Sequence, residues 1–152
     1  MHGGGVLAHE VMGGRYLTKE EIESLLEEAK IARFCSLNDD GTIHAAPVWF
    51  KYENGKIVIV TPDQSVKARN VKRDENVTIL IDVANQLTRG VLIYGTAELD
   101  NESDLRPTGI SIGEKYMSKE EARDYADAIY SKTKGLKITV KPERMASFDY
   151  SG

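Results

Sequence analysis

The chain has 152 residues, of which 41% are hydrophobic and 29% are charged, and its formal net charge is -4. This size and composition are typical of one soluble globular domain that buries a single core. The acidic balance argues against nucleic acid as a main partner, because binding to a phosphate backbone requires a net basic surface. No apolar run approaches the roughly 20 residues that span a membrane, which argues against a membrane partner.

The cysteine content and the first residues indicate a cytoplasmic protein. Cys35 is the only cysteine, which excludes an intramolecular disulfide and suits a reducing compartment. The N-terminal residues lack the basic and long apolar stretches of a secretory signal. Five glycines among the first 15 residues, with no sustained periodicity, predict a flexible arm over residues 1–17. Residues 18–152 are then expected to form a single domain.

Seven segments have the pattern of β-strands. Between them, Asp39-Asp40-Gly41 and Glu53-Asn54-Gly55 have the chemistry of tight hairpin turns, so the neighbouring strands should be antiparallel. These strands are predicted from the alternation of apolar and polar residues and from the content of β-branched residues. They are expected over residues 31–37, 42–52, 56–61, 77–83, 90–99, 136–141 and 145–150.

Helices are predicted before and between these strands. Thr18 with Glu21 has the pattern of a capping box that begins a first helix. Residues 102–134 change to a helical period, interrupted at Pro107 and Gly109, and end at Gly135. This segment holds a second capping box, Ser118 with Glu121, and its expected packing stripe consists of Ala122, Tyr125, Ala126, Ile129 and Thr133. The expected fold class is therefore mainly β with flanking helices (α+β), built on an antiparallel barrel of six or seven strands.

A short helix after Pro62 has the chemistry of an anion site. Either Asp63 or Ser65 could cap it, and we expect Asp63 to do so, since a carboxylate near a bound phosphate is otherwise repulsive. Lys67 lies in the first turn, where unpaired N–H groups and the helix dipole favour an anion. Lys67, Arg69, Lys72 and Arg73 form a local basic cluster, for which a solvated helix face is the alternative.

The strand before this helix has features that suit a flat ring. Pro47 removes a ladder donor, which indicates an edge, a bulge or an opening for a ligand. The small residues Ala45 and Ala46 would let a ring approach the backbone. Trp49, the only tryptophan, is either an interface residue or a neighbour of that ring. By alternation, Ala45, Pro47 and Trp49 share one face, and His44, Ala46, Val48 and Phe50 the other.

The remaining reactive side chains carry weaker signals. His44, on its own in a strand, is expected to be structural. Cys35 alternates with Ile31, Arg33 and Leu37 along a strand and is expected to be a small buried hydrophobe. The three histidines and the carboxylates have no metal-ligand spacing, so we predict no metal site.

The segment from Gly41 to Phe50, the pattern Ser65-x-Lys67-x-x-Asn70 and the strand through Gly95 together resemble the pyridoxamine 5′-phosphate oxidase-like FMN-binding split barrels. The resemblance implies a split β-barrel that forms a homodimer with FMN at the subunit interface. It implies an oxidoreductase that passes electrons between the flavin and a small substrate or nicotinamide donor. The cofactor-binding residues that it implies are Ala45, Ala46, Pro47, Val48, Trp49, Phe50, Val60, Thr61, Ser65, Val66, Lys67 and Asn70.

Two alternative functions stay open from the sequence, and a third activity is not expected. The tail over residues 143–148 holds Arg144 but lacks the histidine of the substrate motif in true pyridoxamine phosphate oxidases, so vitamin B6 oxidation is not expected. The sequence also resembles deazaflavin-dependent reductases, whose phosphorylated cofactor Lys67 could equally anchor. A non-catalytic flavin-binding or electron-carrying module is the third reading. No catalytic side chain is identified, because a flavin supplies its own redox chemistry.

Overall fold

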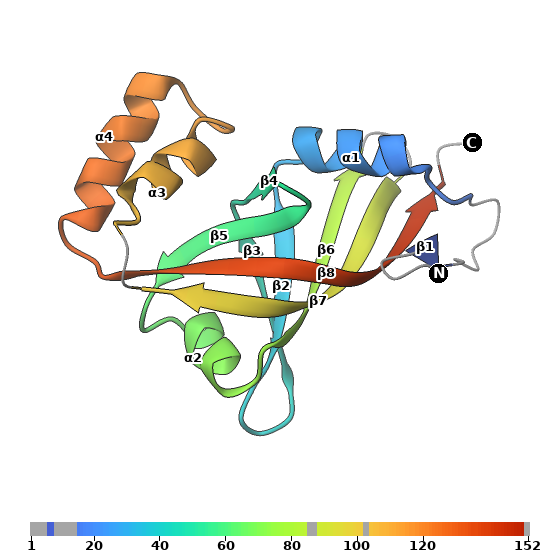
Figure 1. The fold of residues 1–152 in the computed structure, drawn as a ribbon, viewed down its shortest axis with the longest axis horizontal. Coiled ribbons are helices and arrows are strands. Elements are labelled where there is room, and N and C mark those ends of the chain that lie inside the picture. Colours follow the sequence, from blue (N-terminus) through green and yellow to red (C-terminus); the bar gives the residue numbers. More distant parts are fainter. Residues whose placement is uncertain (1–5, 8–14, 85–87, 102–103, 151–152) are drawn as a thin grey trace.

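A computed structural model describes residues 6–7, 15–84, 88–101 and 104–150. Its strands form one sheet in the order β3-β2-β6-β7-β8-β5-β4, and β1 pairs with β8 in parallel beside this path (Figure 1). Every neighbouring pair along the path is antiparallel. The strands are β1 (Val6–Leu7), β2 (Ala32–Leu37), β3 (Ile43–Val48), β4 (Lys51–Glu53), β5 (Lys56–Pro62), β6 (Asn76–Ala84), β7 (Thr88–Asp100) and β8 (Gly135–Asp149).

Four described helices flank this curled sheet, which confirms the predicted fold class. They are α1 (Lys19–Glu28), α2 (Val66–Arg73), α3 (Arg106–Gly113) and α4 (Lys119–Tyr130). In Figure 1, α1 crosses one end of the sheet, α2 lies at the other end, and α3 and α4 stand together beyond the end of β5. None of the described helices is long and apolar enough to cross a membrane.

The predicted strand over residues 42–52 is wrong as one continuous element. The chain breaks after Val48, and the two parts become β3 and β4, which lie at opposite ends of the strand order. Trp49 and Phe50 therefore connect the two edges of the sheet, and this connection curls it into a half-barrel. Pro47 lies in β3, which among the described strands pairs with β2 alone, so of the three alternatives for Pro47 the structure shows the edge position.

The two predicted strands over 136–141 and 145–150 are also wrong as separate elements. They form the single strand β8, which pairs with β5, β7 and β1. The register with β7 shifts between Tyr94, which pairs with Arg144, and Gly95, which pairs with Pro142. Glu143 is therefore the extra residue of a β-bulge. The bulge interrupts the two-residue alternation, and this interruption suggested a strand boundary.

The core fills the inside of the curled sheet beneath α1. Leu25 and Leu26 of α1 are fully buried against apolar residues of the strands, including Phe34 and Ile79. The described end of the expected arm, residues 15–17, is tied to β8: Arg15 pairs with Asp149, and the Leu17 N–H donates to Ser147 Oγ at 2.9 Å. Most of that arm lies outside the described residues.

The helices α3 and α4 pack on each other as a hairpin. Ala122 and Ala126 are buried in that contact, as expected from the predicted stripe. Tyr125 and Ile129 of the same stripe are exposed instead, because their side of α4 faces a pocket. The loop after α3 joins this hairpin to the barrel through Tyr116, whose hydroxyl accepts from the Phe50 N–H at 3.0 Å and donates to the Phe50 carbonyl at 3.3 Å.

Candidate functional site

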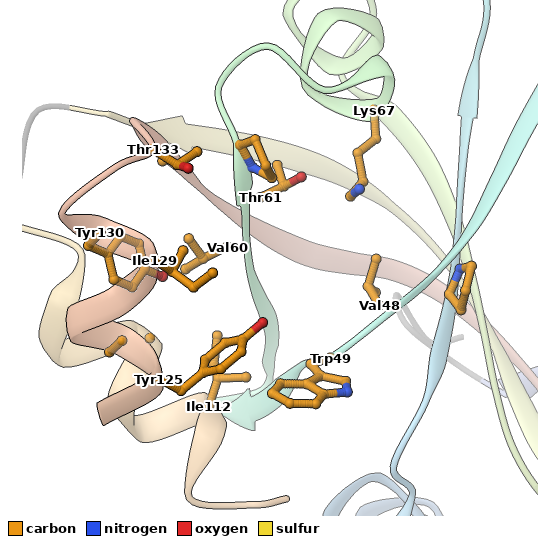
Figure 2. A pocket seen from close by; sticks show the side chains of 15 residues that line it. Val48, Trp49, Val60, Thr61, Lys67, Ile112, Tyr125, Ile129, Tyr130 and Thr133 are labelled. Carbon is orange, nitrogen blue, oxygen red and sulfur yellow. The ribbon is translucent and has the colours of Figure 1, made fainter. Parts of the chain in front are cut away.

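A pocket of about 310 Å³ lies between the barrel and the α3–α4 hairpin (Figure 2). The barrel supplies the end of β3, the end of β5 and the first turn of α2, and the hairpin supplies the opposite wall. Its volume is near the lower end of the range for small-molecule sites. The lining residues are Pro47, Val48, Trp49, Val60, Thr61, Pro62, Lys67, Gly109, Ile112, Tyr125, Ala126, Ile129, Tyr130, Thr133 and Gly135.

Lys67 makes one end of the pocket cationic. The helix α2 begins at Ser65, whose Oγ accepts from the Ala68 N–H at 3.2 Å and lies 3.0 Å from Thr61 Oγ1. This cap places Lys67 in the first turn, half-buried and facing into the pocket (Figure 2). Its ammonium forms no hydrogen bond or ion pair with any described residue, and burial lowers its pKa. A desolvated cation without a counter-ion in a helix's first turn suits a bound anion.

Asp63 does not cap α2, which corrects the sequence-based expectation. Its carboxylate is buried and pairs with Lys72, with Lys72 Nζ 3.0 Å from Asp63 Oδ1. The hydrogen bond from Lys72 holds the pKa of Asp63 below its usual value. Lys72 thus neutralises the carboxylate next to the pocket, and the repulsion expected between Asp63 and a bound phosphate is reduced.

Of the predicted basic cluster, only Lys67 lines the pocket. Arg69 is exposed on α2 and does not line the pocket. Arg73 instead binds the Leu37 carbonyl and donates to Asn70 Oδ1 at 3.0 Å. The cluster therefore divides into one side chain available to a ligand and two that hold the protein together, with Arg69 in solvent.

Trp49 forms the other end of the pocket, within an aromatic group. Its ring stacks on Tyr116 with a centroid distance of 4.5 Å and an interplanar angle of 10°. Tyr125 of α4 lies 5.6 Å away at a tilt of 40°. The stacking on Tyr116 and the two hydrogen bonds between Tyr116 and Phe50 hold Trp49 at the end of β3. Trp49 is still 36% exposed, so part of its surface remains accessible.

Six of the twelve predicted cofactor residues line this pocket: Pro47, Val48, Trp49, Val60, Thr61 and Lys67. Phe50 is fully buried, with Lys115 Nζ 3.5 Å from its ring centroid. Ala45 and Val66 are exposed, and Ala46 faces the inner side of β3. Ser65 serves as the cap of α2. Asn70 is buried and donates to Ser36 Oγ and Asn38 Oδ1, so it links α2 to the β2–β3 hairpin.

The sequence left open which helix of residues 102–134 covers the pocket, and in the structure both α3 and α4 line it. Tyr125, Ala126 and Ile129 were recognised as a stripe, but a helical stripe does not identify its partner surface. Gly109 carried a signal, since a Cβ there would lie 2.5 Å from the Tyr130 hydroxyl. The glycine lets α3 approach α4 closely, which places Tyr130 at the pocket.

His44, Cys35 and Arg144 lie outside this pocket. His44 is on the inner side of β3, and its buried Nδ1 has no hydrogen-bond partner among the described residues. Cys35 is only partly buried, which corrects the expectation of a small buried hydrophobe, and this partial burial raises the pKa of its thiol. The Arg144 guanidinium lies 4.3 Å from the centre of the Tyr94 ring. Cys35 and Arg144 line a separate, open cavity over the sheet.

A protein-family model and several solved structures match this chain. The family model described as pyridoxamine 5′-phosphate oxidase matches residues 18–144. A conserved hypothetical protein from Mycobacterium tuberculosis has a similar structure, with a TM-score of 0.77 and 25% identity, covering 89% of this chain and 86% of that protein. An FAD-binding protein from Mesorhizobium loti has a TM-score of 0.67 at 16% identity, covering 89% and 94%.

An F420 reductase has a TM-score of 0.63 at 18% identity, covering 84% of this chain and 98% of that protein. At such identities, these last two structures show a shared fold. Curated protein sequences gave no match. The family model covers most of the chain, including both sides of the pocket. The chain therefore belongs to the pyridoxamine 5′-phosphate oxidase family.

Proposed function

We propose that this protein binds FMN, with the phosphate of the cofactor at Lys67, and acts as a flavin-dependent oxidoreductase on a small substrate. The observation that carries the proposal is the half-buried ammonium of Lys67, which pairs with no described residue and lies at one end of a largely apolar pocket. The structural likeness to an FAD-binding protein supports it. The single cysteine suits work in a reducing, cytoplasmic compartment.

The residues of the pocket fit the parts of such a cofactor. Lys67 offers a point charge to the phosphate, and the Thr61 hydroxyl beside the cap of α2 offers a further hydrogen bond. Val48, Val60 and Trp49 offer apolar surface to the ribityl chain and ring. A bound flavin supplies the redox chemistry, and the protein is needed to hold and orient it and to exclude water.

The proposed enzyme is not a vitamin B6 oxidase. The tail of the chain lacks the histidine of that substrate motif. Its arginine, Arg144, stacks on Tyr94 and lines the separate cavity rather than the pocket with Lys67. Detection of pyridoxamine phosphate oxidation would contradict this part of the proposal.

We further propose a homodimer that completes the site. The outward-facing residues of the edge strand β3 and its end are Ile43, Ala45, Pro47 and Trp49, which form an exposed apolar stripe. Ile43 is 72% exposed. Such a stripe on a sheet edge favours association with another chain. Because Pro47 and Trp49 also line the pocket, a second copy covering the stripe would narrow its open side.

The experiment that tests cofactor identity is an absorption spectrum of the untreated protein, followed by denaturation and chromatography of any released compound. Yellow protein that releases FMN supports the proposal. Colourless protein that also fails to bind added FMN overturns it.

Light scattering during size-exclusion chromatography tests the dimer, with Ile43→Lys expected to yield monomers. A monomeric wild-type protein would contradict the proposed assembly.

A second candidate is a deazaflavin-dependent reductase, favoured by the structural likeness to an F420 reductase. Lys67 would anchor the phosphate of either cofactor, because its point charge interacts with the phosphate and does not distinguish the two ring systems. The spectrum of the released compound separates the two candidates. A bound flavin that no nicotinamide donor reduces would favour a non-catalytic carrier instead.

A further inference from the structure

The helices α3 and α4 have a small core of their own. The main core cluster of the described residues joins the strands to α1 and α2. The buried apolar residues of the α3–α4 hairpin lie outside that cluster; they are Leu105, Ile112, Ala122 and Ala126. Figure 1 shows the hairpin standing apart from the barrel, beyond the end of β5. A unit with a separate core can move as one body, because its internal packing is kept during the movement.

One end of this hairpin is attached tightly to the barrel. The Asp63 N–H, directly after β5, donates to the Lys134 carbonyl at 2.9 Å. Leu105 and Tyr130 approach Gly135 so closely that a Cβ there would lie 3.2 and 3.3 Å from their side chains. Contacts this close leave little room for movement. We call this end, residues 133–135, the base of the hairpin.

The other end is held by the loop between the two helices, residues 114–117, which we call the latch. The Tyr116 hydroxyl accepts from the Phe50 N–H and donates to the Phe50 carbonyl, and its ring stacks on Trp49. Water can replace a hydroxyl in both hydrogen bonds once the loop moves away. Such bonds contribute little net free energy to the closed arrangement, so the latch can open while the barrel stays folded.

Lys115 attaches the latch to the end of α1 in an unfavourable setting. Its Nζ donates to the Leu26 carbonyl at 3.2 Å, and Lys30 Nζ donates to the Lys115 carbonyl at 2.7 Å. Burial, and to a smaller extent the charge of Lys30, lowers the pKa of Lys115 to about 8, while Glu27 acts in the opposite direction. The closed latch thus disfavours an ammonium group that solvent would stabilise after opening.

The pocket lies between the base and the latch. Thr133 and Gly135 of the base line it at one end, and Trp49 lines it where Tyr116 of the latch is stacked. Figure 2 shows Tyr125 of α4 next to Trp49 at that second end. Movement of the latch away from the barrel would separate Trp49 from both tyrosines and widen the pocket there. A ligand that contacts both walls would hold them together, because it binds the closed form better.

We propose that the hairpin of residues 104–134 is a lid that turns about its base and opens at the latch to admit the ligand of the pocket. Opening breaks the polar contacts of Tyr116 and Lys115 and one ring stack, while the cores of the barrel and the hairpin stay packed. This motion goes beyond the proposed function, since it is a property of the chain and is the same for FMN and for a deazaflavin.

Amide hydrogen exchange in the cofactor-free protein, followed at single residues by NMR, tests the lid. The Phe50 N–H reports on the latch, the Asp63 N–H on the base, and the Ile79 N–H, in the central strand β6, on the barrel core. After correction for intrinsic rates, Phe50 should exchange at least about hundredfold faster than Ile79 and at least about tenfold faster than Asp63. Saturation with FMN should slow the exchange of Phe50 by at least about tenfold.

A variant of the latch that leaves Phe50 and the pocket unaltered makes the test specific. Lys30→Ala removes the hydrogen bond to the Lys115 carbonyl. The exchange of Phe50 should then rise by about threefold to tenfold, the worth of one hydrogen bond, while Asp63 and Ile79 keep their rates. Lys19→Ala is the matched control, because it removes the same charge from an exposed position at the start of α1 and should change none of the three rates.

Four results would overturn the lid. Equal protection of Phe50 and Ile79 would mean that the latch opens only when the whole protein unfolds. Equal protection of Phe50 and Asp63 would mean that the hairpin detaches without a base. Equal Phe50 rates in Lys30→Ala and Lys19→Ala would exclude the latch, and an unchanged Phe50 rate with FMN bound would exclude closure on the ligand. A protein that binds no FMN contradicts the proposed function instead, and the measurements without cofactor still decide the lid.

Discussion

Replacing Lys67 with alanine should weaken FMN binding without harming the fold. The ammonium is half-buried and pairs with no described residue, so its removal leaves no orphaned partner in the cofactor-free protein. The loss of binding free energy should therefore equal the free energy of the interaction between Lys67 and the phosphate. A charge-assisted hydrogen bond contributes about 1.5 to 3 kcal/mol, which corresponds to a roughly 10- to 150-fold increase in Kd.

The assay can use the protein's own fluorophore. Trp49 is the only tryptophan and lines the pocket, so quenching of its emission by added FMN reports on binding at this site. Arg69→Ala is the matched control, because it removes the same charge two residues further along α2 from an exposed position. Its Kd should change by less than about twofold, since exposed charges are well screened.

Two outcomes would refute the reasoning about Lys67. Equal Kd values for wild type and Lys67→Ala would show that the phosphate lies elsewhere. Equal losses for Lys67→Ala and Arg69→Ala would show that net charge, and not a positioned cation, governs binding. The thermal unfolding midpoint of Lys67→Ala should not fall, because the substitution removes a desolvated charge.

Three further predictions concern the framework of the site. Tyr116→Phe leaves the Phe50 N–H and carbonyl without their hydroxyl partner, so urea denaturation should show a loss of about 1 to 3 kcal/mol, with a change in tryptophan emission. Burial lowers the pKa of Lys115 from 10.5 to about 8, so the folded state holds fewer protons than the unfolded state between these values. The free energy of unfolding should thus rise with pH across that window, and Lys115→Gln should reduce the rise between about pH 8 and about pH 9.5. Gly95→Ala would place a Cβ against the Lys141 carbonyl at the bulge, and calorimetry should show destabilisation of roughly 1 to 3 kcal/mol, whereas an unchanged midpoint would show that β7 and β8 can separate there.

Features set by neighbouring residues could be predicted well. Both capping boxes, Thr18 with Glu21 and Ser118 with Glu121, are present in the structure. The turn at Asn54 and Gly55 has the positive φ angles that its sequence predicts, 53° and 75°. These features depend on backbone groups within a few residues, so the local sequence contains the information they need.

Errors arose where a distant segment decided the outcome. The strand pattern from residue 42 to 52 continues through Trp49 and Phe50, and only the pairing of β3 with β2 and of β4 with β5 separates it. The sequence makes Asp63 a suitable cap for α2. In the structure its carboxylate pairs with Lys72, nine residues further along the chain, and Ser65 caps the helix instead. In both cases a contact formed on folding outweighs a local preference.

By itself, the sequence determined the family pattern, the fold class and the cation after Pro62, because hydrophobic periodicity and turn and cap chemistry are local properties. The tertiary structure alone decided which cation of four faces the pocket and which six predicted residues meet there. It also brought Tyr125 and Tyr130 to the opposite wall. The physical reason is that a pocket is defined by surfaces from distant segments, and their approach depends on packing across the whole fold.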